Sequence, residues 1–307
     1  MMHVILNPNS RKGRKYTLQR LQSLLGEDLV PATEEDEPQR MLVVGGDGTL
    51  HRALNTHKPK ELYYLPCGTV NDKGHTTEER LTVGRYEGGV FSYVMAVGSF
   101  TDIAYTTSGK SKRFLGKLAY FWEAIRRFRP WYIHAKTPYT SNGEGVYTLL
   151  MLLVGRRCFG FDFVREERGN HAQKRGNKGR IRQRENKDLG DGTGENEAEN
   201  AKNKVKNTYF LSIKAPKSRG FWGKIHLFLH FFRVFFVGIR PPYDRFGIQL
   251  YPTDSVSIAL CSPAPFCVDG ERTLARDIHC AFCQTDTALY IVNGKSKRKE
   301  RKRASAT

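Results

Sequence analysis

The chain has 307 residues, a hydrophobic fraction of 39% and a formal net charge of +19. It is long enough to build packed cores, and its length predicts about two domains. The charge favours anionic partners, which are nucleic acid, anionic lipid surfaces or phosphorylated ligands. No apolar run approaches the roughly 20 residues that span a bilayer, and no signal peptide precedes the strand-like run at 3–6. We therefore expect a cytoplasmic protein that is soluble or peripheral at the inner membrane surface.

The six cysteines suit a reducing compartment. Cys280 and Cys283 stand beside His279, but a zinc site needs a second pair at similar spacing, and the sequence offers none. The surrounding residues are typical of a strand, in which positions three apart face opposite sides. We expect these thiols to pack inside the protein.

Residues 1–90 alternate between strand and helix patterns. In chain order, we expect a strand at 3–7, a helix near 15–25, strands at 29–33 and 41–44, a helix from about residue 50 and a strand at 63–65. This alternation is typical of a parallel α/β domain, which binds its ligand outside the carboxyl ends of its strands. Three of these ends carry polar or glycine-rich loops, with the sequences NPNSRKG, GGDGT and PCGTVND.

The GGDGT loop at 45–49 is the most informative of the three. It follows four apolar residues that predict a buried strand, and its glycines abandon side-chain packing for backbone freedom. Glycines at this place let backbone N–H groups approach an anion, and a helix that starts there adds its positive end. A tight turn needs fewer glycines, so the loop favours a phosphate site.

From about residue 90 the pattern becomes strand-rich. Expected strands at 91–98, 147–155, 208–215, 254–261 and 287–292 predict an antiparallel second domain, which a helix near 112–129 interrupts. Residues 165–207 contain no Phe, Trp or Tyr and predict a disordered basic insertion. We expect an α/β domain at 1–90, a β-rich domain at 91–293 and a basic disordered tail at 294–307.

Four segments together resemble the diacylglycerol kinase catalytic-domain family, which includes soluble bacterial lipid kinases and is related to the sphingosine kinases. They are NPNS at 7–10, GGDGT at 45–49, LPCGTVND at 65–72 and VDGE at 268–271. GGDGT alone is moderately specific, because NAD kinases and phosphofructokinases carry similar loops, but the order and spacing of all four match. The resemblance implies a nucleotide-binding α/β domain, a β-rich lipid-binding domain, and ATP in the cleft between them.

The resemblance also implies a role for each motif. The family transfers the γ-phosphoryl group of ATP to a lipid hydroxyl, which requires positioning, a metal that screens charge and a base. By resemblance, Asp269 or Glu271 takes the proton from the lipid hydroxyl, and Asp47 and Asp72 help to hold Mg²⁺. The residues implied in ATP binding are Asn7, Ser10, Thr33, Gly45, Gly46, Asp47, Gly48, Thr49, Gly68, Thr69 and Asn71.

Three of the motifs also have a purely structural explanation. Asn7 can mark a turn after a strand, Gly68 a helix start, and Asp269-Gly270 a hairpin turn. Beside GGDGT and in this order, they favour the kinase interpretation.

Several positions depart from the family pattern. Arg11, Arg52 and Thr82 stand where the family usually carries Gly, Glu and Asp. Residues 206–208 replace an acidic segment that forms a structural metal site in bacterial members, so we expect that site to be missing. These departures weaken the prediction of activity more than the prediction of the fold.

Residues 220–242 form the second unusual feature. On a helix, Gly223, His226, His230 and Arg233 would make a narrow polar stripe among aromatic and aliphatic residues. A helix buried against a sheet and a membrane-facing helix explain this pattern equally well. Basic segments at 174–187 and 295–303 would add attraction to anionic lipid, so we hypothesise peripheral docking on an anionic membrane.

The leading hypothesis is an ATP- and Mg²⁺-dependent lipid kinase that makes phosphatidic acid from diacylglycerol. The alternatives are an NAD kinase-like enzyme, and a degenerate kinase fold that binds anionic lipid or RNA. The basic segments lack aromatic residues for base stacking, so no specific nucleic-acid partner is expected. An exposed aromatic helix would also suit a dimer face, which leaves the oligomeric state open.

Overall fold

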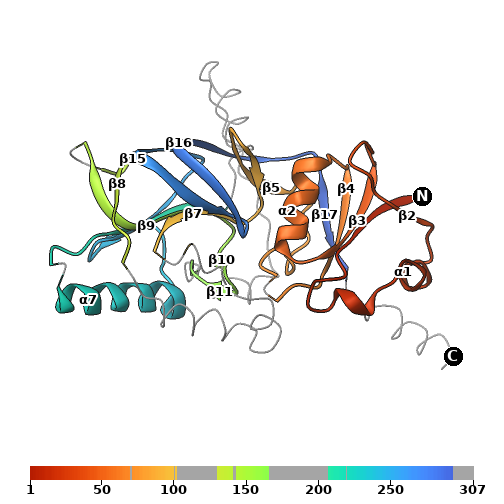
Figure 1. Ribbon diagram of the computed structural model, residues 1–307, viewed down its shortest axis with the longest axis horizontal. Coiled ribbons are helices and arrows are strands. Elements are labelled where there is room, and N and C mark those ends of the chain that lie inside the picture. The colour runs from red at the N-terminus through yellow and green to blue at the C-terminus, as the bar shows by residue number, and fades with distance from the viewer. Residues whose placement is uncertain are drawn as a thin grey trace, which may run out of the picture.

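The computed structural model describes residues 1–69, 71–99, 101, 130–140, 143–165, 207–218 and 220–292. Within them the chain forms a parallel sheet and a larger antiparallel sheet, which lie at opposite ends of the molecule (Figure 1). This combination confirms the predicted fold class. The expected helix at 112–129, residues 166–206 of the expected insertion and the expected tail at 294–307 lie outside the described residues.

The parallel sheet has five strands in the order β17-β4-β3-β1-β2. Their bounds are Met2–Leu6 for β1, Leu29–Pro31 for β2, Arg40–Gly45 for β3, Glu61–Pro66 for β4 and Ala288–Ile291 for β17. The central strand β3 is covered on both faces, which explains its continuous apolar run. Because β4, β3 and β1 are adjacent and parallel, the loops that follow them leave the sheet at the same edge.

Two helices belong to this part of the chain. A 3₁₀ turn at Gly13–Lys15 precedes α1 (Leu18–Leu25), whose N-cap Thr17 accepts the Arg20 backbone N–H at 3.3 Å. The helix α2 spans Asp47–Thr56 and so begins inside the GGDGT loop, earlier than the expected start near residue 50.

The antiparallel sheet has ten strands. The order is β13-β14-β12-β9-β7-β15-β16-β5-β6, with β8 pairing β15 and β9. The bounds are Thr82–Tyr86 for β5, Gly89–Phe91 for β6, Val94–Gly98 for β7, Ile133–Lys136 for β8, Gly145–Val154 for β9, Thr208–Lys214 for β12, Tyr243–Arg245 for β13, Ile248–Pro252 for β14, Ser255–Val268 for β15 and Glu271–Gln284 for β16. A separate small sheet pairs β10 (Arg157–Cys158) with β11 (Phe161–Asp162).

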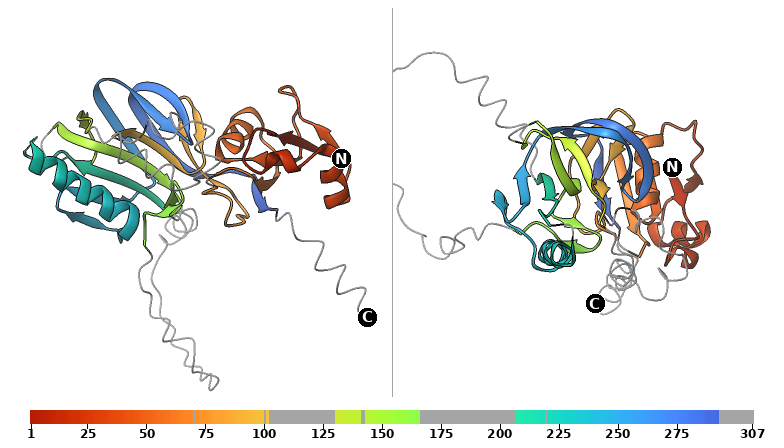
Figure 2. Two further views of the ribbon diagram at one scale, coloured as in Figure 1. Left: turned by 60° about the horizontal axis from the view of Figure 1, so that its bottom comes forward. Right: turned by 60° about the vertical axis from the view of Figure 1, so that its left-hand side comes forward.

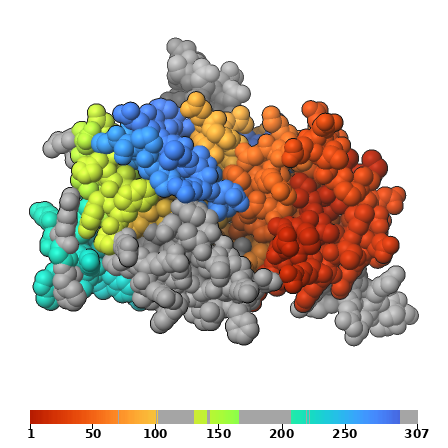
Figure 3. All heavy atoms as spheres, viewed as in Figure 1, coloured from red at the N-terminus to blue at the C-terminus, as the bar shows by residue number. Residues whose placement is uncertain are grey.

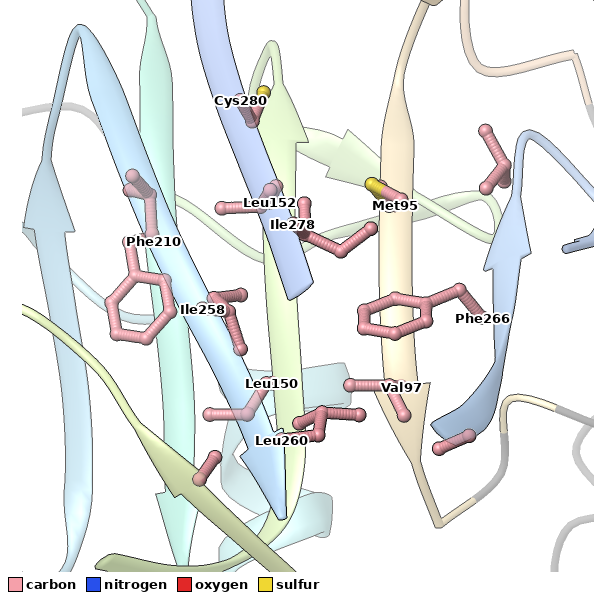
Figure 4. Close-up of a cluster of buried hydrophobic side chains, with 14 of the residues drawn as sticks. Met95, Val97, Leu150, Leu152, Phe210, Ile258, Leu260, Phe266, Ile278 and Cys280 are labelled. Atoms are coloured by element: carbon pink, nitrogen blue, oxygen red, sulfur yellow. The ribbon is translucent and has the colours of Figure 1, made fainter. Parts of the chain in front are cut away.

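The side chains of β7 and β9 pack alternately into two cores. Met95 and Leu150 enter a core shared with β15 and β16 (Figure 4). Val94 and Met151 pack on the other face, in one cluster with Leu227 of the helix α7 (Phe221–Phe232). Because both faces of β9 are covered, its sequence is a continuous apolar run and does not alternate between apolar and polar residues. The thiols of Cys280 and Cys283 likewise face two different cores, as expected for strand neighbours.

Sheet membership crosses the expected division between residues 90 and 91 in both directions. The strand β5 precedes that division and β6 spans it, but both belong to the antiparallel sheet. The last strand, β17, was expected among the antiparallel strands, but it pairs with β4 in parallel register, so that expectation was wrong. The pairing gives the edge of β4 a partner that lies more than two hundred residues away in sequence, which local patterns do not reveal. The division into domains itself stays a prediction.

The helix α7 (Phe221–Phe232) continues as a π-helical turn over Arg233–Val237 and lies along one face of the antiparallel sheet (Figure 2). Leu227, Phe231 and Val234 are buried against that sheet. The helix is therefore buried on one face only. Among the described residues, no helix combines the length and the apolar character that crossing a bilayer requires.

The expected polar stripe on α7 is divided in the structure. Gly223 and His230 are buried, whereas His226 and Arg233 are exposed. The backbone explains Gly223, because a Cβ there would overlap the carbonyl group of Ser218. Burial, with smaller contributions from the charges of His226 and Arg233, lowers the pKa of His230 to about 4. The side chain of His230 is thus a neutral core group at neutral pH and not a headgroup ligand.

Candidate functional site

The loops after β1, β3 and β4 form one connected backbone unit. The Asn7 N–H donates to the Val44 carbonyl at 2.9 Å. The Cys67 N–H donates to the Gly45 carbonyl at 2.6 Å, and the Lys12 N–H donates to the Cys67 carbonyl at 2.9 Å. The three loops that the sequence singled out therefore meet at one edge of the parallel sheet.

The N-terminus of α2 opens into this junction. Gly46 is its N-cap, and no side chain caps the helix. The first backbone N–H groups of a helix lack intrahelical acceptors and carry the positive end of its dipole, so this end is suited to an anion such as phosphate. A Cβ at Gly46 would lie 3.2 Å from the Gly68 Cα, which shows how closely two of the loops approach.

Replacing Gly45 by alanine is expected to destabilise the fold by about 1–3 kcal/mol, because the added methyl group overpacks a closed site. A Cβ at Gly45 would lie 2.6 Å from the Thr49 Cβ. Thermal unfolding followed by circular dichroism measures the change. As a control, Gly220→Ala places its Cβ no closer than 3.7 Å to any neighbour and is expected to cost much less. Equal melting temperatures for Gly45→Ala and the native chain would contradict the close packing.

Side-chain hydrogen bonds hold the loops in place. Asn7 Nδ2 donates to Thr49 Oγ1 at 3.0 Å and thereby ties the first loop to α2. The Ser10 hydroxyl donates to the Asn7 carbonyl at 2.8 Å. In the third loop, Asn71 Oδ1 accepts the Gly68 N–H at 2.9 Å. Asn71 therefore stabilises the loop to which it belongs.

A cavity of about 950 Å³ lies over the N-terminus of α2. It brings together most of the residues predicted for the site: Asn7, Ser10, Gly46, Asp47, Gly48, Thr49, Gly68, Thr69, Asp269 and Glu271. Residues from the loops of the parallel sheet form one wall, and the turn between β15 and β16 forms another. Gly45, Asn71 and Asp72 do not line this cavity, although each contacts a residue that does.

Three arginines also line the cavity, namely Arg11, Arg14 and Arg52. Two of them are positions where the chain departs from the family pattern. Arg14 was missed by sequence reasoning, although the basic loop that carries it was a visible signal. Guanidinium groups are suited to phosphate contacts, so these three arginines would suit an anionic ligand.

Thr33, predicted near the nucleotide, lines a smaller neighbouring cavity of about 400 Å³. Val4, Ile5 and Leu6 contribute an apolar wall to it. Arg52 and Thr56 line both cavities, so the two are contiguous along α2.

Asp47 is buried and lies near two other carboxylates. Tyr64 donates its hydroxyl to Asp47 Oδ1 at 3.2 Å, and the Asp72 N–H donates to Oδ2 at 2.8 Å. Burial raises the pKa of Asp47 well above its ordinary value near 3.8, and the charges of Asp72 and Asp269 raise it further. The two hydrogen bonds oppose this rise only in part.

Asp269 is a buried anchor. Its Oδ1 accepts the backbone N–H groups of Tyr93 and Val94 at 3.0 Å each. Its Oδ2 accepts both the N–H and the hydroxyl of Ser92 and lies 3.3 Å from Nδ1 of His51. Asp269 also occupies the left-handed region, with φ of 49°, as the hairpin interpretation of Asp269-Gly270 predicted. Both of its oxygens are therefore engaged in holding the β15–β16 turn.

Glu271 lines the same cavity as Asp269 but differs from it in exposure. It is exposed and lines the cavity. A Cβ at Gly48 would lie 3.3 Å from Glu271 Oε1, which places the carboxylate beside the N-terminus of α2. Of the two carboxylates that the VDGE motif offers, Glu271 is the more exposed.

Among the residues that the structure describes, no three His, Cys, Asp or Glu side chains are grouped so that they could hold a metal ion. Mg²⁺, however, usually uses one or two carboxylates and completes its shell with phosphate oxygens and water. Asp47 lines the cavity and hydrogen-bonds to the backbone of Asp72. Asp72 lines a different cavity, so Mg²⁺ beside Asp47 would need phosphate oxygens and water for most of its ligands.

Thr82, the third departure, lines a different cavity. Its backbone N–H donates to Glu78 Oε2 at 2.9 Å, and Lys73 Nζ lies 2.8 Å from Glu78 Oε1. This largely buried ion pair occupies the place where the family pattern suggested an acidic residue. The carboxylates whose charges act on Asp47 at the start of α2 are those of Asp72 and Asp269.

Comparisons with known proteins agree with the motifs. Residues 10–78 match the sequence profile described as Diacylglycerol kinase catalytic domain. A diacylglycerol kinase from Staphylococcus carnosus is 29% identical over 110 residues, and one from Staphylococcus epidermidis is 31% identical over 111 residues. Each match covers 28% of this chain, and the chain spans about a third of the length of these relatives, 35% and 34% respectively.

The similarity of fold extends much further than that of sequence. The crystal structure of a diacylglycerol kinase from Bacillus anthracis superposes with a TM-score of 0.59 and 16% identity, and it covers 95% of this chain and 96% of its own. The parallel sheet, the antiparallel sheet and their connection are therefore those of a known fold. Together these matches confirm the resemblance of this chain to the diacylglycerol kinase catalytic-domain family, which its motifs predicted.

Proposed function

We propose that this chain is an ATP-dependent lipid kinase, which transfers the γ-phosphoryl group of ATP to the hydroxyl group of diacylglycerol and forms phosphatidic acid. One observation supports this proposal above the others. A cavity that combines a helix N-terminus with three arginines also receives Glu271, an exposed carboxylate, from the turn between β15 and β16. Phosphoryl transfer consists largely of positioning and charge stabilisation, and these groups supply both.

The phosphate chain of ATP would lie along the N-terminus of α2. Arg11, Arg14 and Arg52 surround this position and would neutralise its charge. The adenosine moiety would extend into the smaller cavity with Thr33, because that cavity is contiguous with the first and has an apolar wall.

Glu271 would accept the proton of the attacking hydroxyl group, because it is the accessible carboxylate beside the phosphate position. Asp269 would hold the turn that carries Glu271 and would not contact the substrate. Asp47 and Asp72 would help to hold Mg²⁺, which when bound neutralises charge on the phosphates. His51, which lies 3.3 Å from Asp269, would link α2 to this turn.

The choice of a lipid as acceptor follows from the relatives, whose names describe diacylglycerol kinases. The exposed apolar face of α7, on the same sheet that carries Glu271, is consistent with a substrate drawn from a membrane. No described feature favours NAD as the acceptor.

Transfer of labelled phosphate from ATP and Mg²⁺ to a panel of acceptors tests this function. The panel contains diacylglycerol, a sphingoid base and phosphatidylglycerol in mixed micelles, with NAD as a soluble acceptor. We expect transfer to diacylglycerol, and Arg52→Ala is expected to raise the KM for ATP about tenfold or more, since a charge-assisted contact to phosphate is lost. Arg80, an exposed arginine paired with Asp286 outside the cavity, is the matched control, and Arg80→Ala is expected to leave KM unchanged.

Two outcomes would contradict the proposal. Transfer to NAD alone would assign the chain to a different class of kinase. Binding of anionic lipid or RNA, without transfer to any acceptor, would instead support a degenerate kinase fold.

A further inference from the structure

The exposed side of α7 and the tip of the neighbouring hairpin carry large apolar side chains. Seven side chains, here called the aromatic surface, are between 39% and 76% exposed: Trp222, Phe228, Leu229, Phe232, Phe236, Val237 and Phe246. Six lie on α7 and its π-helical extension, and the seventh lies at the tip of the β13–β14 hairpin. The helix forms the outer lower edge of the molecule in the space-filling view (Figure 3).

The hairpin tip is held against α7. A Cβ at Gly247 would lie 3.8 Å from His230 Cε1, so this turn touches the helix. On the other side, the guanidinium carbon of Arg233 lies 5.4 Å from the centroid of the Tyr243 ring, in the first strand of the hairpin. Phe246 therefore extends the surface that α7 begins.

The backbone at Phe246 is a second, independent observation. Phe246 and Gly247 are the two central residues of the β13–β14 turn, with φ of 56° and 77°. Turns with this geometry strongly prefer Asn-Gly or Asp-Gly, because a bulky residue is strained in the left-handed region. The chain nevertheless places a phenylalanine there and exposes 72% of it. Strain at an exposed aromatic residue points to a contact made outside the chain.

The segment that carries α7 has charges of a single sign, although the exposed Asp162 of β11 lies beside its end. Residues 207–243 contain no Asp or Glu. Lys217, Lys224, Arg233, Arg240 and Arg245 are all exposed. Asp244, the first acidic residue that follows, accepts hydrogen bonds from Gln249 at 3.0 Å and from Tyr251 at 2.7 Å, so its carboxylate is engaged within the sheet.

We propose that the aromatic surface docks on an anionic lipid bilayer, with the apolar side chains in the headgroup and acyl boundary and the surrounding cations at lipid phosphates. A helix with this composition lies in the plane of the interface. Each cation near an anionic membrane adds further attraction. This inference names the surface by which the proposed lipid kinase reaches its substrate.

A second copy of the chain is a less suitable occupant. A two-fold interface would place the same patch on both subunits and would bring the cations of one against the cations of the other. Nucleic acid would leave Leu229 and Val237 facing a polar backbone. An anionic bilayer satisfies both the apolar and the basic residues.

Phe246→Asn gives the sharpest test, because it should move stability and binding in opposite directions. Asparagine suits the turn, so the melting temperature is expected to stay equal or to rise. Partitioning onto vesicles that contain phosphatidylglycerol, measured by sedimentation without nucleotide, is expected to weaken about tenfold, since a buried phenylalanine is worth that factor or more. Native binding is expected to weaken in high salt and on neutral vesicles.

Leu274→Asn is the matched control. Leu274 is 68% exposed on β16, away from the aromatic surface, and its replacement is expected to leave vesicle binding unchanged. Unchanged binding by Phe246→Asn, or an equal loss in Leu274→Asn, would overturn the proposal. The proposal would also be overturned if the native chain did not bind vesicles but formed dimers, and if the Phe246→Asn variant were monomeric.

The assay is separate from the test of the proposed function, because vesicle binding needs neither ATP nor transfer. Phe246→Asn is expected to retain transfer to a short-chain diacylglycerol that is dissolved in water. If the native chain binds vesicles but transfers phosphate to no acceptor, the proposed kinase function is wrong. The proposed docking surface is then still supported.

Discussion

Replacing Glu271 by glutamine is expected to slow phosphoryl transfer by ~10²–10⁴-fold, which is the range that general-base catalysis contributes. Glutamine keeps the size of the side chain but cannot accept a proton at neutral pH. Because Glu271 is exposed and lines the cavity, the melting temperature is expected to change little. Steady-state rates with diacylglycerol and a thermal melt measure both quantities on the same preparation.

Asp269→Asn is the comparison that separates the two carboxylates. Both carboxylate oxygens of Asp269 accept hydrogen bonds from backbone N–H groups. In the asparagine variant, the amide nitrogen would replace one of these oxygens and would face donors that it cannot accept. The variant is expected to lose about 3 kcal/mol of stability, since buried donors are left without an acceptor. Below its melting temperature, it should keep transfer within about tenfold of native, as expected for a positioning group. A folded Asp269→Asn protein without activity, beside an active Glu271→Gln protein, would assign the base to Asp269.

Asp47→Asn is expected to stabilise the fold and to abolish transfer. The buried carboxylate of Asp47 lies near those of Asp72 and Asp269, so its charge is costly. An uncharged amide of the same size removes this cost and is expected to gain about 1–3 kcal/mol of stability at neutral pH. At the same time, it removes a carboxylate from the proposed metal and phosphate site, and transfer should fall below detection. Gains in stability at the expense of activity are typical of residues kept for function.

The stability gained in Asp47→Asn is expected to depend on pH, in a direction that follows from the raised pKa of Asp47. The pKa of Asp47 is near 3.8 in the unfolded chain and well above that in the folded chain. Between these values the folded state holds a proton that the unfolded state has lost, so the contribution of Asp47 to stability falls as pH rises. The advantage of Asp47→Asn should therefore be absent below pH 3.8, should grow as the pH rises above it, and should level off above the folded pKa. Melting temperatures measured across pH on both proteins follow this difference.

Asp286→Asn is a suitable control for the charge change. Asp286 is 92% exposed in its side chain, and the same substitution there is expected to leave the melting temperature unchanged at every pH. A lower melting temperature for Asp47→Asn at neutral pH would show that its charge stabilises the fold instead.

Several features of this site could be predicted before the fold was known. Glycines after an apolar run specify a phosphate-binding loop because backbone freedom and strand burial are local properties. The loops after β1, β3 and β4 were expected to meet because parallel strands end at one edge of their sheet. Other features could not be predicted. Arg14 enters the cavity through a 3₁₀ turn that the sequence pattern did not show.

The sequence by itself determined the parallel and antiparallel parts, the three loops and the family resemblance, because each depends on the order of nearby residues. Only the tertiary structure showed that Asp269 is buried and that Glu271 is exposed. The donors that occupy Asp269 come from Ser92 and its neighbours, up to 177 residues away along the chain. The tertiary structure also decided the pairing of β17 and the face that α7 exposes. The burial of a side chain and the pairing of a strand depend on which distant segments pack together. The hydrophobic periodicity of one segment does not identify the segment that packs against it.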